Sequence, residues 1–229
     1  MLCAHFLFDC LVLPLNILIR IRNTLSSSVF ALFRRLSTMT IPKTIPMNMI
    51  VAVDASNGIA KDNSLPWHLP QEYKHFQSGT IKTNDPAKKN VVLMGRKCWE
   101  SIPTKFRPLK NRINVVLSRA MPREISDDFL VLNDFDEAIR ILTTTEPFAS
   151  RVETIWNVGG KEVYALGLAH PLMKDLVITR IQKGFDTDVA FPEVDWENFE
   201  RNDDFDGKEI EEKGLVYTIN SYTRKTFGK

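Results

Sequence analysis

Cysteine, glycine and histidine are scarce in this 229-residue sequence, which contains three, ten and four of them. Three cysteines (Cys3, Cys10 and Cys98) cannot build a disulfide framework, and only Cys98 lies in the main body of the chain, which suits a reducing compartment. No Cys or His pair has metal-ligand spacing. The G-x-G-x-x-G fingerprint, the P-loop and the G-x-S-x-G elbow are also missing. These absences disfavour hydrolases and metal-dependent enzymes, and we predict no metal site.

A large excess of one charge is also missing, because 30 basic residues face 28 acidic ones. That balance gives no reason to expect nucleic acid as a partner. The distribution is nevertheless uneven. Residues 1–46 hold five basic residues and one acid and carry +4, which leaves 25 basic and 27 acidic residues, or −2, for residues 47–229.

The first 46 residues have the composition of a leader rather than of a folded domain. The apolar run from Phe6 to Ile19 is interrupted by Asp9, Pro14 and Asn16, so it is too short and too polar for a membrane span. A secretory signal is disfavoured because the start lacks positive charge and no A-x-A-like site follows. We therefore expect no stable membrane insertion.

The second part of the leader, Arg20 to Thr40, is rich in Arg, Ser and Leu and has no acid, which is typical of an organellar transit peptide. The alternative is a leader absent from the working protein, because Met39 or Met47 could begin it. Ile41 to Pro46 is predicted to be a linker. We divide the chain into a leader, 1–46, and a folded domain, 47–229. The expected location is the cytoplasm, with mitochondrial import through the leader as the alternative.

Short apolar runs alternate with helical patterns along the folded domain. This alternation predicts an α/β fold with a mostly parallel central sheet of about eight strands, helices on both faces and an antiparallel C-terminal edge. Gly79 is expected to end the first helix, and Asn133 to cap the third. The predicted strands are 49–53, 90–94, 113–117, 129–132, 154–158, 176–181 and 215–226, and the predicted helices are 71–78, 96–102, one following Asn133 and one through 163–166.

Glu72 is the first candidate for chemistry. It lies near a predicted helix start and close to the aromatic residues Trp67, Tyr73 and Phe76. A carboxylate in an apolar pocket wall can hold an amidine-like heterocycle by two hydrogen bonds, and burial would raise its pKa into the range of proton transfer. The alternative is an ordinary acid that stabilises the first turn of a helix.

Two strand ends carry cations. Val91 to Trp99 is a buried strand that runs into Gly95, Arg96 and Lys97 at a helix start, and Val115 to Arg119 is a strand that ends in Ser-Arg. Free N–H groups and cations at such ends can bind phosphate. The alternative for each is a solvated cation.

Two further features favour ligand binding. Gly159 and Gly160, between a strand and a helix, allow close approach of the backbone to a ligand, although they would equally suit a tight turn. Arg112 lies in an otherwise apolar segment, where it could receive a carboxylate.

Taken together, these segments resemble the dihydrofolate reductase family from about Met49 to Thr226. Each segment is weak evidence, but their shared order and spacing are specific. They are Ile50-Val-Ala-Val53, Leu65-Pro-Trp67, Met94-Gly-Arg-Lys97, Trp99-Glu-Ser-Ile-Pro103, Arg107-Pro-Leu-Lys110, Arg112-Ile-Asn-Val-Val-Leu-Ser-Arg119, Val158-Gly-Gly160, Val163-Tyr164, Thr179-Arg-Ile181 and Phe191-Pro192.

The resemblance implies hydride transfer from NADPH to 7,8-dihydrofolate to give tetrahydrofolate, which supplies one-carbon carriers for thymidylate, purine and amino-acid synthesis. Glu72 would bind the pterin and favour protonation at N5 through water, with Thr179 supporting it and Trp67 ordering that water. Arg112 would receive the substrate's α-carboxylate. The implied substrate-binding residues are Ile50, Val51, Glu72, Tyr73, Phe76, Gln77, Ile102, Leu109, Arg112, Val158, Tyr164 and Thr179.

For the cofactor, the resemblance implies a lid formed by Asp54–Trp67, a cis peptide at Gly159-Gly160, and a 2′-phosphate contact by Ser118 and Arg119. Antifolate inhibitors and a monomeric state are expected as well. The implied NADPH-binding residues are Ala52, Gly58, Ile59, Ala60, Ser64, Gly95, Arg96, Lys97, Cys98, Leu117, Ser118, Arg119, Gly159, Gly160, Lys161, Glu162, Val163 and Tyr164.

The chain departs from the family pattern at several positions. Cys98 replaces a threonine that meets the pyrophosphate, and a thiol is a weaker donor. Asn133 stands where vertebrate members have an arginine near the 2′-phosphate, and Ala60 replaces a frequent lid glycine. Two alternatives stay open: a related pteridine or pyrimidine reductase, and a module that binds folate or NADP without catalysis.

Overall fold

The computed structural model describes residues 44–202 and 207–225. The predicted transit peptide, Cys3, Cys10 and the alternative start at Met39 lie outside these residues. The prediction of a linker over 41–46 is wrong for its last residues. Ile45 is buried in the core, and the Pro46 carbonyl accepts a 2.9 Å hydrogen bond from the Ile155 N–H. Among the described residues, no helix is long and apolar enough to cross a membrane.

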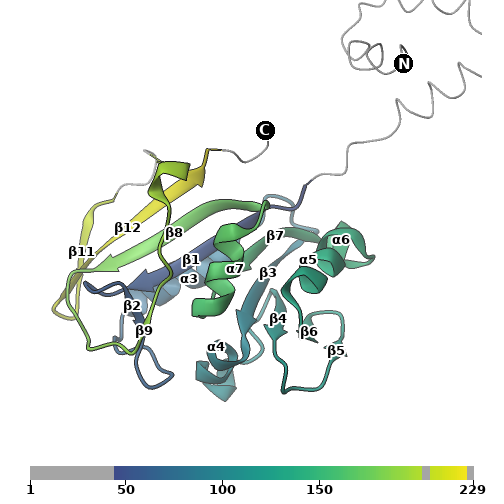
Figure 1. Ribbon diagram of the computed structural model, residues 1–229, viewed down its shortest axis with the longest axis horizontal. Helices are drawn as coiled ribbons and strands as arrows, with labels where there is room; N and C mark the ends of the chain where they lie inside the picture. Colours follow the sequence, from purple (N-terminus) through teal and green to yellow (C-terminus); the bar gives the residue numbers. More distant parts are fainter. Residues whose placement is uncertain (1–43, 203–206, 226–229) are drawn as a thin grey trace, which may run out of the picture. The chain divides into compact units, whose positions relative to one another are not determined.

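A ten-stranded sheet forms the centre of the domain, with the order β10-β12-β8-β1-β7-β3-β4-β6-β5 and β11 paired to β12 (Figure 1). The six strands from β8 to β6 are parallel, and antiparallel strands lie at both edges. The strands are β1 (Met47–Val53), β3 (Lys89–Gly95), β4 (Ile113–Leu117), β5 (Glu124–Ile125), β6 (Phe129–Leu132), β7 (Val152–Asn157), β8 (Met173–Ile181), β10 (Phe199–Arg201), β11 (Glu209–Glu212) and β12 (Leu215–Arg224).

This arrangement confirms the predicted fold class, including the antiparallel C-terminal edge. The expected number of about eight strands is too low, because β5, β10 and β11 have two to four residues and too few alternating positions to be recognised. A separate pair of short strands, β2 (Gly58–Ala60) and β9 (Val189–Ala190), joins the loop after β1 to the loop after β8.

Helices cover both faces of the sheet, as predicted. Figure 1 shows α5, α6 and α7 in front of the sheet and α3 behind it. Alternate residues of the central strands therefore enter different cores: Leu93 packs on the α5 side, and Met94 on the side of Phe76 from α3. The helices are α3 (Pro70–Ile81), α4 (Arg96–Ser101), α5 (Phe135–Thr144), α6 (Phe148–Arg151) and α7 (Lys161–Ala169), with 3-10 turns η2 (Thr104–Phe106) and η3 (Trp196–Asn198).

Two predicted helix boundaries are wrong. Gly79 does not end α3, which continues to Ile81, and the Thr80 hydroxyl donates to the Phe76 carbonyl at 2.8 Å within the helix. Helix α5 is capped by Asp134 rather than Asn133, since the Asp134 carboxylate accepts a 2.7 Å hydrogen bond from the Glu137 N–H. Both acids and amides make good N-caps, so the sequence alone left an ambiguity of one residue.

Candidate active site

The predicted ligand-binding residues gather at one edge of the sheet. Gly95 is the last residue of β3, and Ser118 and Val158 directly follow β4 and β7, which are the parallel neighbours of β3. Ala52 lies near the same end of β1, which pairs with both β7 and β8. Ligands of open parallel sheets bind at this edge, and the chain's phosphate and pterin candidates converge there.

Glu72 occupies the first turn of α3, after Leu69 at the N-cap and Pro70 at the first helical position. Its side chain is buried, with 5% of the residue exposed, and Oε1 accepts a 3.2 Å hydrogen bond from the Thr179 hydroxyl of β8. Thr179 is fully buried. The first-turn acid predicted from spacing is therefore an inward-facing carboxylate rather than a solvated one.

Burial raises the pKa of Glu72 to about 7, because removal from water disfavours the ionised form. The Thr179 hydrogen bond opposes this rise, and repulsion from the nearby Glu212 carboxylate adds to it. An acid with this pKa exchanges its proton near neutral pH, as general acid–base chemistry requires.

Two aromatic residues, Trp67 and Tyr73, lie close to Glu72 in the sequence. Trp67 is 4% exposed, and its indole Nε1 is buried without a hydrogen-bond partner among the described residues. The Tyr73 hydroxyl donates to the Trp67 carbonyl at 3.2 Å and so ties α3 to the preceding loop. Because buried N–H groups are nearly always satisfied, the Trp67 indole is a donor suited to a water or a ligand.

The apolar residues predicted to line the substrate pocket form one cluster on the α3 side of the sheet. Ile50 and Val158 are buried members of this cluster, and Phe76, Ile102 and Leu109 pack against it in partly buried positions. This juxtaposition brings together residues spread over more than 100 positions of the chain. Their exposed parts offer a wall for a flat, largely apolar ligand.

Three residues that were predicted to bind the substrate do not lie in this apolar cluster. Val51 and Tyr164 belong to the cluster on the opposite face of the sheet, because successive residues of β1 point to opposite sides. The buried Tyr164 hydroxyl donates to the Ile50 carbonyl at 2.9 Å. Gln77 is exposed on α3. These three side chains therefore lie outside the apolar cluster that contains Ile50 and Val158.

Arg112 is a buried cation, with 4% of the residue exposed. Its Nη1 donates to Thr80 at 2.8 Å, its Nε donates to the Lys110 carbonyl at 3.1 Å, and the guanidinium lies 6.0 Å from the centre of the Phe76 ring. Burial lowers its pKa to about 10. None of the ion pairs within residues 44–202 and 207–225 includes Arg112. Its remaining N–H groups suit a carboxylate ligand.

Glycines begin both helices at the candidate phosphate site. Gly95 and Gly160 are the N-caps of α4 and α7, and neither helix has a side-chain cap. The Gly95 N–H donates to the Gly159 carbonyl at 2.7 Å, which holds the two helix starts side by side. The Gly159-Gly160 peptide is cis, as expected. A Cβ at Gly159 would lie 2.5 Å from the Tyr164 ring, whereas one at Gly160 would enter open space.

The side chains predicted to bind the cofactor near these glycines differ in exposure and in the partners they already contact. The Arg96 guanidinium pairs with Glu100 at 2.8 Å, and the half-buried Cys98 thiol faces the Val158 carbonyl at 3.5 Å. Burial raises the pKa of Cys98 to about 11, so the thiol stays protonated. The Ser118 hydroxyl accepts the Ala120 and Met121 N–H groups. Lys97, Arg119, Lys161 and Glu162 are exposed, Leu117 is half-buried, and Val163 is buried.

The loop 54–67 is anchored at its start and middle. Asp54 is buried and accepts hydrogen bonds from the N–H groups of Ser56, Gly58 and Phe185 at 2.7–3.0 Å. Burial alone would raise the pKa of Asp54, but these hydrogen bonds outweigh it and lower the pKa. Lys61 pairs with Asp186 at 2.6 Å in an exposed position. The predicted lid residues Gly58 and Ile59 are buried, Ala60 is half-buried, and Ser64 is exposed.

Two buried acids near the site were not predicted as such: Asp54, named only as the first residue of the lid, and Glu212, which received no role. Asp54 follows directly after a strand and precedes an Asn-Gly pair, a turn signal that could have identified it. Glu212 lies in an acidic stretch, Glu209 to Glu212, that resembles an exposed strand, and no local signal marks its burial.

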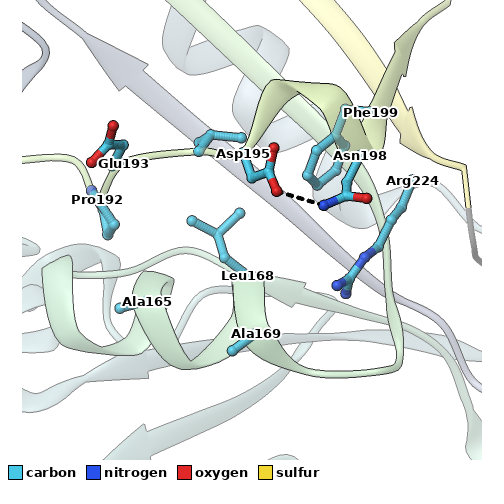
Figure 2. A pocket seen from close by; sticks show the side chains of 10 residues that line it. Ala165, Leu168, Ala169, Pro192, Glu193, Asp195, Asn198, Phe199 and Arg224 are labelled. Atoms are coloured by element: carbon cyan, nitrogen blue, oxygen red, sulfur yellow. Dashed lines mark hydrogen bonds between the residues drawn. The ribbon is translucent and has the colours of Figure 1, made fainter.

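A pocket elsewhere in the domain is unrelated to these residues. Figure 2 shows Leu168 and Ala169 of α7 facing the segment around Pro192 and Phe199, with Arg224 at one side. Its cavity volume is about 290 Å³. None of the predicted site residues lines it, so we do not assign the chemistry to this pocket. Within the described ranges, no group of three His, Cys, Asp or Glu side chains could hold a metal ion.

Comparison with known proteins agrees with this geometry. A family model described as "Dihydrofolate reductase" matches residues 46–224. A Caenorhabditis elegans relative is 46% identical over 155 residues, which cover 68% of this chain and 82% of that protein. The Rattus norvegicus dihydrofolate reductase is 41% identical over 184 residues, 79% of this chain and 98% of that protein. A solved structure of Schistosoma mansoni dihydrofolate reductase superposes with a TM-score of 0.70 at 32% identity, covering 80% of this chain and all of that one.

Proposed function

Because the chain belongs to the dihydrofolate reductase family, we propose that it is an oxidoreductase that reduces 7,8-dihydrofolate to 5,6,7,8-tetrahydrofolate with NADPH. Reduction of the N5=C6 bond requires a hydride at carbon and a proton at nitrogen. The observation that carries the proposal is Glu72, a buried carboxyl group that accepts a hydrogen bond from Thr179 and whose pKa burial raises to about 7. The product would supply one-carbon carriers for thymidylate, purine and amino-acid synthesis.

Glu72 would bind the 2-amino and N3 groups of the pterin with its two oxygens. The Thr179 hydroxyl, 3.2 Å from Oε1, would hold the carboxylate in that orientation. The Trp67 indole N–H, which has no hydrogen-bond partner within residues 44–202 and 207–225, would order a water between the acid and N5. Because the pKa of Glu72 is close to the ambient pH, the acid can release and regain a proton in each turnover.

The residues at the strand ends fit a phosphate-bearing dinucleotide. When bound, NADPH supplies the hydride. The uncapped helix starts at Gly95 and Gly160 leave backbone N–H groups for the pyrophosphate, and the open space at Gly160 admits the ligand close to the backbone. Ser118 and the exposed Arg119 would bind the 2′-phosphate, which favours NADPH over NADH. The 54–67 loop would close over the nicotinamide and exclude water.

Arg112 supports folate over other pteridines. Its buried guanidinium would bind the α-carboxylate of the glutamate moiety, which a simple pteridine lacks. The retained Glu72 argues against a module that only binds ligand, because binding alone does not require a proton donor near neutral pH.

A spectrophotometric assay of the purified chain tests the proposal. We expect NADPH oxidation with 7,8-dihydrofolate and much slower oxidation with pteridines that lack the carboxylate. Turnover of another pteridine with none of dihydrofolate would assign the chain to a related reductase. Ligand binding without turnover of any pteridine would favour the non-catalytic module. NADH in place of NADPH tests the contribution of Ser118 and Arg119 in the same assay.

We further propose a monomer that binds antifolate inhibitors, requires no nucleic acid and acts in the cytoplasm, with the chain before Thr44 as a separate leader. The mitochondrial alternative rests on the Arg-rich, acid-free composition of Arg20–Thr40. A fusion of residues 1–46 to a fluorescent reporter distinguishes the two locations. Diffuse cytosolic fluorescence would exclude import, and the N-terminal peptide of the mature protein would show whether the leader is retained.

A further inference from the structure

Glu212, at the end of β11, contacts the first turn of α3 from across the structure. Its two carboxylate oxygens accept hydrogen bonds from the Gln71 N–H at 3.0 and 3.2 Å. Glu212 is 8% exposed, and the Tyr217 hydroxyl donates to its Oε2 at 3.3 Å. A buried acid 141 positions away therefore binds the peptide group directly before Glu72.

Helix α3 needs such an acceptor. The N-cap position is Leu69, whose side chain cannot accept a hydrogen bond, and Pro70 has no N–H group. The Gln71 N–H is thus an early helical donor without an intrahelical partner. Glu212 takes the place of a local cap, and its negative charge is also favourable at a helix N-terminus.

We propose that Glu212 is a positioning residue for the reduction: it anchors the first turn of α3 through Gln71, holds the Glu72 carboxylate against Thr179, and places a second negative charge beside it. This role rests on the function proposed above, and it adds a residue that does not itself touch the substrate.

Glu212 also acts electrostatically on Glu72. The titratable groups that interact with Glu72 are Tyr73 from its own helix, Tyr164 from α7, Tyr217 from β12 and Glu212 from β11. Glu212 is the other acid in this set, and its repulsion favours the protonated form of Glu72. Burial and the neighbouring Glu212 raise the pKa of Tyr217 to about 12, so Tyr217 remains a hydrogen-bond donor to Glu212 at neutral pH.

The decisive variant is Glu212→Gln, which retains a carbonyl oxygen for the Gln71 N–H and removes the charge. Without the repulsion, Glu72 loses its proton at lower pH. At low pH we expect the kcat of the variant to equal that of wild type. The decline of kcat at alkaline pH should begin at a lower pH in the variant. Beyond the midpoint of this decline kcat should be about two- to tenfold below wild type, because a pKa shift of one unit changes the protonated fraction about tenfold. Glu211→Gln is the matched control, because Glu211 is adjacent on β11 and exposed, and its profile should match wild type.

Glu212→Ala removes the anchor as well as the charge. We expect it to add a severalfold increase in the KM for dihydrofolate at every pH, because the turn that carries Glu72 is no longer fixed. Thermal denaturation of each variant shows whether it is folded. A purely structural role would lower activity uniformly with pH and leave the midpoint of the Glu212→Gln profile at the wild-type value, and that result would overturn the proposal.

Titration of the Glu72 carboxyl carbon by NMR, assigned with Glu72→Gln, gives a test that does not depend on turnover. A lower midpoint in Glu212→Gln than in wild type and in Glu211→Gln supports the proposal, and equal midpoints refute it. If the wild-type protein does not reduce dihydrofolate, the proposed function fails, whereas the titration still reports whether Glu212 acts on Glu72.

Discussion

The hydroxyl of Thr179 donates a hydrogen bond to the carboxylate of Glu72 across 107 positions of sequence, with 3.2 Å between the two oxygens. Both residues are buried, and they come from a central strand and from the helix behind it. Two opposing influences thus meet at one carboxyl group: burial, which favours its neutral form, and the hydroxyl, which favours its charged form.

Glu72→Gln should abolish most turnover. The amide retains the size of the side chain but cannot exchange a proton, so we expect kcat to fall by about 10²- to 10⁴-fold, the usual contribution of general acid–base catalysis. Affinity for NADPH should change little, because Glu72 belongs to a different part of the site. Steady-state kinetics and NADPH titration measure the two effects, and unchanged turnover would refute the role of Glu72.

The same acid should make the stability of the ligand-free protein depend on pH. The pKa of Glu72 is raised from 4.5 to about 7, so its contribution to stability is fully present below pH 4.5 and is lost as pH rises through 7. The loss is on the order of 3 kcal/mol. Urea denaturation at pH 5 and pH 8 should show a larger decline for wild type than for Glu72→Gln. Equal declines would mean that Glu72 is not desolvated in the folded protein.

Thr179→Val should displace the pH profile in the direction opposite to Glu212→Gln. The valine keeps the shape but removes the donor that stabilises the ionised form of Glu72, so the pKa of Glu72 should rise. We expect lower kcat/KM together with an alkaline limb at higher pH. Thr179→Ser keeps a hydroxyl and should restore most of the activity, and a profile in Thr179→Val identical to that of wild type would contradict the assignment.

Arg112→Gln should weaken dihydrofolate binding and leave chemistry largely intact. Hydrogen bonds to a charged group contribute about 1.5–3 kcal/mol, so we expect KM to rise roughly 10- to 150-fold with a small change in kcat. A dihydropterin without the glutamate carboxylate provides the control, because wild type and variant should bind it equally. Equal losses for both substrates would show that Arg112 only supports the fold through Thr80.

The fold was largely predictable from hydrophobic patterning. The predicted strands at 113–117 and 129–132 have the observed bounds, because they are short, mainly apolar runs that are mostly buried. The short strands β5, β10 and β11 were not predicted, since their pairing depends on neighbours that are distant in sequence. The predicted helix ends differ from the observed ones by one to three residues, because neighbouring residues such as Asn133 and Asp134 can serve equally well as caps.

The candidate site was predictable in its residue types but not in its contacts. Glu72 could be singled out from a helix start near aromatic residues, yet its burial depends on Thr179 and on the strands behind α3. Arg96 carries a suggestive charge, but the structure pairs it with Glu100 one turn later. Glu212 had no signal at all, because a cap supplied by another strand leaves no mark near the helix it stabilises.

Arg112 has a consequence for the lifetime of the protein. A buried guanidinium without a carboxylate is costly to keep out of water, so a ligand that supplies one binds the folded chain in preference to the unfolded chain. At a ligand concentration 100 times its dissociation constant, folding gains about 2.7 kcal/mol. A carboxylate ligand that reaches Arg112 should therefore lower the fraction of unfolded chain that is open to proteolysis.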